Sequence, residues 1–220
     1  MEASHAVQDY AKAIYSLERR AGEAVSTNAL AERLGVSAAS ASAMVKRLDG
    51  LGLVEHEPYR GVRLTPRGVR VALEVLRHHR LLELYLAEEL GMPWDQVHRE
   101  AEVLEHVLSE ELEALIAAKL GNPTHDPHGD PIPTIDGKID EGDTRSLDEL
   151  EPGEEAVFAR VSDQDPDMLR YLSGLGIVPG IELQMLGREP FGGPVRVRAK
   201  GQELALGGEL ASAMRVEPSG

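Results

Sequence analysis

Histidine and glutamate side chains that could bind a metal ion gather between residues 97 and 106 of this 220-residue chain. If the stretch is helical, His98, Glu102, Glu105 and His106 stand at i, i+4, i+7 and i+8 and share one face. Imidazole and carboxylate groups together suit a divalent first-row metal, and the chain has no cysteine to add a thiolate. The residue types therefore indicate an N and O site that favours Mn2+ or Fe2+. The alternative interpretation is a solvated helix face.

Three further side chains could join such a site. His79 and Glu83 are four residues apart in a segment, 66–90, that has helical apolar spacing. Pairs of this kind recur by chance in many helices. Asp9 lies off the apolar stripe of a first helix predicted at 5–20, where a solvated charge is the ordinary interpretation.

A proline-, glycine- and aspartate-rich segment, 122–152, contains His125, Asp126 and His128. We interpret this segment as an irregular connection between domains. A polar loop offers no rigid geometry to a metal ion. We therefore expect these three side chains to be solvated and not to act as ligands.

Two short helices joined by a tight turn are predicted between residues 26 and 48. Ser26 is a suitable N-cap for the first helix, Gly35 ends it, and Ser37 caps the second. This is the helix-turn-helix pattern, and the small side chains that begin its second helix permit close approach to base edges. Basic residues follow, where phosphate contact is expected. The predicted DNA contacts are Ser37, Ala39, Ser40, Ser42, Lys46 and Arg47.

A β-hairpin follows the second helix directly. Strand-like runs at 53–56 and 62–65 flank Pro58, Tyr59, Arg60 and Gly61. A hairpin in this position forms a wing. We expect Arg60 at its tip to lie against the sugar-phosphate backbone of DNA.

The charge of the chain is uneven. The first 80 residues hold 12 Lys and Arg against 9 Asp and Glu, whereas the rest hold 11 against 29, within a net charge of -15. A basic N-terminal part on an acidic remainder indicates a local anionic partner. No apolar run approaches the roughly 18 residues of a membrane helix, and the N-terminus has no signal-peptide features. We therefore expect a cytoplasmic protein without membrane contact.

Two more units are predicted beyond the hairpin. A helix at 109–120 carries more apolar side chains than a two-layer helical unit can bury, which predicts a homodimer interface. Short β-runs then appear at 156–161, 181–186, 195–198 and 214–216, with a helical turn at 167–172. These runs predict a small SH3-like β-barrel without a catalytic constellation.

In combination, these segments resemble the diphtheria toxin repressor family of metal-activated transcriptional repressors over nearly the whole chain. The resemblance implies a mainly α fold with small β elements. Its expected parts are a winged helix-turn-helix domain at 1–72, a helical dimerisation and metal-binding domain at 73–121, a linker at 122–152 and an SH3-like domain at 153–220. The segments that carry the resemblance are 13–17, 51–54, 64–68, 79–83, 97–109, 121–123 and 130–133, and 175–180 with 190–194 is similar to modules of ferrous-iron uptake proteins.

The resemblance also implies two metal sites. The first would use Asp9, Glu102, Glu105 and His106, and the second would use His79, Glu83 and His98. The iron-responsive branch of the family draws further ligands for the second site from the SH3-like domain. Asp165 and Asp167 are the local candidates for that role.

Two positions bear on the choice of metal. The iron-responsive branch has Cys where Glu102 stands and Met where Asp9 stands, whereas the manganese-responsive branch has carboxylates. Hard oxygen ligands favour Mn2+. Lys12, however, stands where the manganese branch usually has Glu, and that branch usually lacks the third domain. Fe2+ is therefore kept as the alternative, and Co2+, Zn2+ or Cd2+ are expected as substitutes in vitro.

The implied activity is metal-dependent repression: the metal is a co-repressor of a homodimer that binds a double-stranded DNA operator and controls metal homeostasis. Two other classes stay open on the residues alone. One is a binuclear metallohydrolase or oxidase, although no separate acid, base or nucleophile accompanies the ligands. The other is a winged-helix regulator that senses an organic ligand.

Overall fold

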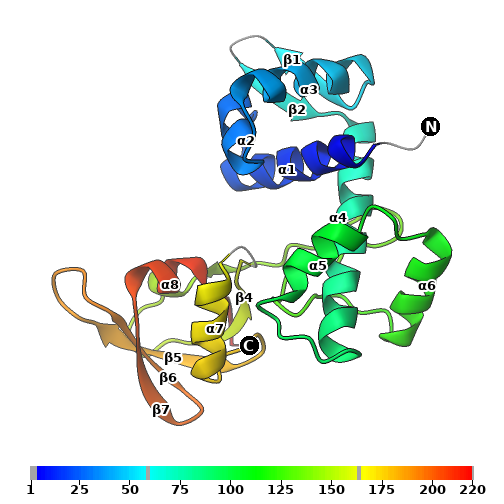
Figure 1. Ribbon diagram of the computed structural model, residues 1–220. Helices are drawn as coiled ribbons and strands as arrows, with labels where there is room; N and C mark the ends of the chain where they lie inside the picture. The colour runs from blue at the N-terminus through cyan, green and yellow to red at the C-terminus, as the bar shows by residue number, and fades with distance from the viewer. Residues whose placement is uncertain (1–3, 58–59, 163–164, 220) are drawn as a thin grey trace. The chain divides into compact units, whose positions relative to one another are not determined.

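The computed structural model describes residues 4–57, 60–162 and 165–219, which form two compact units (Figure 1). The first unit contains the residues up to His79 together with Glu105–Leu108 and Pro133–Lys138. The second contains Arg80–Leu104, Ser109–Ile132 and the chain from Ile139 onward. No helix in the described ranges combines the length and the apolar content needed to cross a membrane.

The first unit is a winged helix-turn-helix domain. Its core is formed by side chains that include Ile14, Leu30, Val45, Leu48 and Val62. The strands of the hairpin pair antiparallel in direct register. Its elements are α1 (His5–Ala21), α2 (Thr27–Arg33), α3 (Ala38–Gly50), β1 (Val54–Glu57), β2 (Gly61–Leu64) and the first part of α4 (Pro66–Glu88).

The predicted caps of the helix-turn-helix are present. Ser26 Oγ accepts a hydrogen bond from the backbone N–H of Ala29 at 3.1 Å, and Ser37 Oγ accepts one from Ser40 at 3.1 Å. These bonds satisfy N–H groups that the first helical turn leaves without a partner inside the helix. They fix where α2 and α3 begin, and so they set the turn between the two helices.

The helical part of the second unit contains α5 (Val97–Leu104) and α6 (Glu110–Lys119). Ser109 caps α6, since its Oγ accepts from the backbone N–H of Leu112 at 3.3 Å. Ile116 is buried, but Leu112 and Leu115 are 49% and 62% exposed. This open apolar face is the surplus that predicted a dimer interface.

The prediction that His98 to His106 share one helical face is wrong at the C-terminal end of this stretch. Helix α5 ends at Leu104, so Glu105 and His106 lie in the following turn and belong to the first unit. The physical reason is tertiary. The carboxylate of Glu105 is buried among side chains of the first unit, and Ser109 starts a new helix only a few residues later.

The C-terminal part of the second unit is a six-stranded antiparallel sheet in the order β3-β8-β4-β5-β6-β7. Helix α7 (Pro166–Gly174) contributes Leu169 and Leu172 to its core, and α8 (Gly208–Ala213) contributes Leu210. The predicted β-rich SH3-like domain is confirmed. The strands are β3 (Arg145–Ser146), β4 (Glu155–Arg160), β5 (Glu182–Arg188), β6 (Val195–Ala199), β7 (Gln202–Leu206) and β8 (Arg215–Pro218), with a 3₁₀ turn η1 (Leu147–Glu149).

Two strands, β7 and β3, were not predicted from the sequence. Strand β7 follows β6 through Lys200 and Gly201, whose φ angles of 48° and 76° form a tight hairpin turn without the usual Asn-Gly signal. Strand β3 is only two residues long and lies inside the segment predicted as a linker. It forms because β8 supplies its hydrogen-bonding partners, which no local pattern reveals.

The expectation of a solvated, unstructured segment is also wrong for Asp126 and His128. Both residues are buried, at 6% and 0% exposure, whereas His125 is exposed. Asp126 Oδ1 accepts hydrogen bonds from the backbone N–H of His128 at 2.8 Å and of Asp130 at 2.9 Å. The aspartate therefore folds the loop into a rigid turn, as Asp side chains commonly do.

Gly129 lets this loop approach the end of β4. Its φ is +86°, and a Cβ atom there would lie 1.8 Å from the carbonyl oxygen of Ala159. We expect Gly129→Ala to lower the melting temperature of the second unit in calorimetry. The left-handed backbone alone costs an alanine about 1–2 kcal/mol, and the collision adds to it.

Gly180→Ala is the matched control. Its φ is +91°, but a Cβ atom would meet nothing within 4 Å. It should show the cost of the backbone conformation without the collision. Equal destabilisation by the two variants would contradict a close approach at Gly129.

Candidate metal centres

Glu105 is the centre of a buried polar cluster in the first unit. Its side chain is fully buried, and Oε1 lies 2.6 Å from Lys12 Nζ on α1. Oε2 pairs with Nδ1 of His79 on α4. His78 Nδ1 donates to the backbone carbonyl of Glu105 at 3.1 Å. A carboxylate removed from water is stable only with such partners, so the turn after α5 is held against α1 and α4.

His106 meets Asp9 beside this carboxylate. His106 Nε2 lies 2.8 Å from Asp9 Oδ1 and 3.6 Å from Glu105 Oε1. Its other ring nitrogen, Nδ1, is 2.8 Å from Gln8 Oε1, an acceptor, so that nitrogen carries the proton. Gln8 thereby turns Nε2 toward the two carboxylates, as outer partners orient metal-binding histidines.

Asp9, Glu105 and His106 each offer one ligand atom, and these atoms lie within 4.8 Å of one another. Three of the four residues predicted for the first metal site are therefore together in the first unit. Two carboxylates and one imidazole form a hard, anionic donor set that fits a divalent cation such as Mn2+ or Fe2+. The fourth predicted residue, Glu102, belongs to the second unit.

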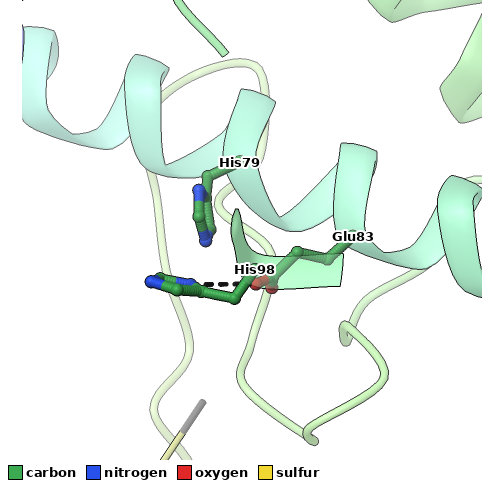
Figure 2. A group of neighbouring side chains, drawn as sticks. All are labelled: His79, Glu83 and His98. Carbon is green, nitrogen blue, oxygen red and sulfur yellow. Dashed lines mark hydrogen bonds and ion pairs between the residues drawn. The ribbon is translucent and has the colours of Figure 1, made fainter. Parts of the chain in front are cut away.

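Three other predicted ligands, Glu83, His98 and Glu102, belong to the second unit. Figure 2 shows His79 and Glu83 one turn apart on α4, with His98 from α5 beside Glu83. His98 Nδ1 lies 3.3 Å from Glu83 Oε1, and its Nε2 lies 3.9 Å from Glu102 Oε1. Glu83 is fully buried, whereas the Glu102 side chain is 45% exposed. A buried glutamate facing an imidazole is again a donor set for a divalent cation.

Asp165 and Asp167 have structural partners on α7. Asp165 is the N-cap, and its Oδ1 accepts from the backbone N–H groups of Asp167 and Met168 at 3.0 Å each. Asp167 pairs with Arg170, which also reaches Asp95 at 3.1 Å. Neither aspartate belongs to a ligand cluster within the ranges that the structure describes.

The predicted DNA-contacting residues lie on an open face. Ala41, Val45 and Leu48 bury the opposite side of α3 in the core. Arg60 on the wing is exposed and pairs with Glu57 at 3.2 Å, while Pro58 and Tyr59 fall outside the described residues. All six contacts predicted on the recognition helix and its cap are exposed: Ser37, Ala39, Ser40, Ser42, Lys46 and Arg47.

Gln8 and His78 are the contacts that sequence patterns missed. Gln8 precedes a candidate ligand on α1, and His78 precedes one on α4. Neighbours in sequence point to different sides of a helix, so adjacency carries no signal of a shared site. Gln8 and His78 make these contacts only because His106 and Glu105 lie in the turn after α5.

Models of three protein domains match the chain. They are the iron dependent repressor N-terminal DNA binding domain at residues 2–62, the iron dependent repressor metal binding and dimerisation domain at 65–134, and the FeoA domain at 145–218. The iron-dependent repressor IdeR of Mycobacterium tuberculosis is 34% identical over 94% of this chain and 95% of the relative. The chain belongs to the iron-dependent repressor family.

Two further proteins illustrate the range of the iron-dependent repressor family. The diphtheria toxin repressor of Corynebacterium efficiens is 33% identical over 94% of this chain and 93% of its own. A solved structure of a manganese-dependent transcriptional repressor in complex with manganese is 45% identical, with a TM-score of 0.90, over 97% of this chain and all of that chain. Family members similar to this chain thus include proteins named for iron and for manganese.

Family membership decides several of the expectations. The protein is a metal-dependent DNA-binding transcriptional repressor with a dimerisation domain and a FeoA domain of SH3-like type. It is not an enzyme, so the binuclear metallohydrolase alternative is set aside. The alternative of a winged-helix regulator that senses an organic ligand is set aside too, since the central domain is a metal-binding domain.

Lys12 places a fixed positive charge on Glu105, which is also a candidate metal ligand. We expect Lys12→Gln to tighten Mn2+ binding by about tenfold in calorimetric titration, because charge repulsion between the ammonium group and the cation is removed. Without metal the same variant should be less stable than the parent protein, since a buried carboxylate loses its partner.

Lys46→Gln removes the same charge on an exposed part of α3 and serves as the control. It should leave Mn2+ affinity and metal-free stability unchanged. Unchanged affinity in Lys12→Gln would refute competition between the ammonium group and the metal.

Proposed function

We propose that this protein is a manganese-dependent repressor in which Mn2+ is the co-repressor of a homodimer. The observation that carries the proposal is the position of Asp9. Asp9 lies on the first helix of the DNA-binding domain, and its carboxylate contacts His106 at 2.8 Å. A metal bound by this pair would join the DNA-binding domain directly to the ligands that follow α5.

The ligand chemistry favours manganese. The first site takes Asp9, Glu105 and His106, with Glu102 as the fourth ligand, and the second takes His79, Glu83 and His98. Carboxylate oxygens outnumber imidazoles in the first set, and the chain has no cysteine. Hard oxygen-rich sites suit Mn2+, whereas thiolates suit softer ions. Similarity to a manganese-dependent repressor at 45% identity supports the same choice.

Metal binding would act by neutralising charge. Asp9, Glu83, Glu102 and Glu105 carry like charges, and a divalent cation removes their repulsion. The bound state would then favour one spacing of the two recognition helices in the dimer, the spacing that fits two operator half-sites. A difference of about 5.5 kcal/mol in cation affinity between two arrangements shifts a population from 1:99 to 99:1.

Fe2+ is the second candidate. The chain carries a FeoA domain, and its relative at 34% identity is named an iron-dependent repressor. Lys12 at Glu105 also supplies a positive charge where an additional carboxylate would strengthen a manganese site. Co2+, Zn2+ and Cd2+ would substitute in vitro, since all three accept N and O ligands.

One titration separates these candidates. The operator is first selected from random-sequence DNA by the metal-loaded protein. Binding to that operator is then measured by fluorescence anisotropy under anaerobic conditions with Mn2+, Fe2+, Co2+ and Zn2+ added separately. Activation by Mn2+ at concentrations at which Fe2+ gives none supports the manganese proposal, and the reverse order would assign iron.

Glu102→Ala should abolish Mn2+-dependent operator binding but leave a folded dimer. The variant removes a ligand and one negative charge from a half-exposed position, where substitutions destabilise the fold less than in the core. Anisotropy gives the operator affinity, and light scattering gives the oligomeric state. Glu100→Ala on the same helix is the control, and it should bind as the parent does. Full Mn2+-dependent binding by Glu102→Ala would contradict the proposed ligand.

Lys46 is proposed to contact a phosphate group. Lys46→Ala should weaken binding to all DNA sequences alike and lower the slope of log K against log salt by about 0.9. Arg99→Ala, an exposed charge on α5, should leave the slope as it is. A change in sequence preference, with an unaltered salt slope, would assign Lys46 to base contact instead.

A further inference from the structure

His5, the first residue of α1, covers one face of the His106 ring. The two imidazole rings are stacked, with centroids 4.8 Å apart and planes 14° from parallel. Both residues belong to the first unit. We propose that His5 is a positioning residue of the first metal site, which holds the ring of His106 in the orientation that binds the cation and slows release of the ion. This inference rests on the proposed function, because it takes His106 as a ligand.

Four polar residues of α1 share the side of the helix that meets the turn after α5. They stand at i, i+3, i+4 and i+7 and are His5, Gln8, Asp9 and Lys12. Each of the four contacts Glu105 or His106. Three of these contacts join polar atoms, whereas His5 contributes the flat face of a ring. His5 therefore restrains His106 in a way that the polar contacts do not.

The first turn of α1 gives His5 a defined place. Val7 is 1% exposed and packs in the core of the first unit. The backbone N–H groups of Val7 and Gln8 donate to the carbonyl oxygen of Ser4 at 2.8 Å and 3.1 Å. These contacts begin the helix at His5 and fix its backbone against the core. The ring of His5 is thus directed to His106 from a rigid support.

The polar contacts of His106 restrain the tilt of its ring weakly. Nδ1 donates to Gln8 Oε1 at 2.8 Å, and Nε2 lies 2.8 Å from Asp9 Oδ1. The N–H bond and the lone pair of an imidazole lie in the plane of the ring. Contacts at the two nitrogens therefore oppose rotation about the line through them least. A contact on the face of the ring opposes that rotation directly, and His5 supplies it.

His5 also lies between His106 and water. The His106 side chain is 8% exposed, although His5 itself is exposed. Exclusion of water strengthens the attraction between a cation and the carboxylates beside it. Release of the cation requires the His106 ring to move away from it. A second ring stacked on His106 hinders this movement, so we expect it to lower the rate of release.

Stacking separates the role of His5 from that of a ligand. A cation bound at Nε2 lies in the plane of the His106 ring, because the lone pair of the nitrogen lies there. The plane of the His5 ring is nearly parallel to that plane and displaced from it. The lone pairs of His5 therefore point past a cation at this position. His5 acts through His106, and the donor set of the first site is unchanged.

Release of Co2+ from the full-length protein tests this role. Co2+ accepts N and O ligands, and its visible absorption reports which ligands surround it. The absorption and the kinetic phase that are missing from His106→Ala belong to the first site. Release is started by mixing with excess EDTA in a stopped-flow instrument. The rate is taken where it no longer depends on the EDTA concentration.

His5→Ala should release this Co2+ about three- to tenfold faster than the parent protein, the effect expected from loss of one aromatic pair. His5→Phe keeps an aromatic face and has no nitrogen. It should release Co2+ within about twofold of the parent rate. Its absorption maxima should equal those of the parent, because the ligands are the same.

His125→Ala is the matched control, since His125 is an exposed histidine in the second unit. It should release Co2+ as the parent does. The melting temperatures of both His5 variants without metal should agree with the parent, because substitutions at exposed positions change stability little.

The possible outcomes separate His5 from the site itself. Unchanged release in His5→Ala would overturn the proposal. Equal acceleration in His5→Ala and His5→Phe, or shifted absorption maxima in His5→Phe, would make His5 a ligand and overturn it too. Absence of a His106-dependent Co2+ ion from the parent protein would overturn the first site, on which the proposed function also rests. A failure of Mn2+ as co-repressor would appear in operator binding and leave these release rates as they are.

Discussion

The burial of carboxylates is the constraint on which the metal-binding parts of this protein depend. Glu83 and Glu105 are 0% and 1% exposed, and a carboxylate withdrawn from water needs a cation or hydrogen-bond donors close by. Lys12 and His79 surround Glu105, and His98 and His128 lie on the two sides of Glu83. Each set of partners includes imidazoles, which can exchange a proton for a metal ion. The contacts that stabilise the fold thus involve the same side chains as the candidate metal sites.

Helix α1 connects this chemistry to the DNA-binding domain. Gln8 and Lys12 reach His106 and Glu105, respectively, and Asp9 offers a carboxylate to the same cluster. The apolar side of α1 packs in the core that also holds α3. A change of charge at the cluster therefore acts on a helix that belongs to the DNA-reading domain. A metal bound at this cluster would therefore act on operator binding through a short physical path.

Features that depend on contacts within a few residues were predicted well. The caps Ser26 and Ser37 define their helices through bonds made within one turn, and the surplus of apolar side chains on α6 predicts its open face. Elements that depend on distant partners were not predicted. Strand β3 exists because β8 pairs with it, and α5 stops at Leu104 because Glu105 is taken into another part of the fold. Turn residues at Lys200 and Gly201 lacked a recognised hairpin signal, so β7 was missed.

The sequence by itself determined the kind of chemistry: histidine and carboxylate ligands, no thiolate, and a helix-turn-helix with a wing. These properties reside in residue types and short spacings, which survive without knowledge of the fold. Only the tertiary structure decided how the ligands are grouped. It ended the helix of His98 and Glu102 before Glu105 and His106, and it buried Asp126 and His128 of a loop that its composition marks as solvated. Burial depends on residues far away in the chain, and a polar loop becomes a rigid part of the core when other elements cover it.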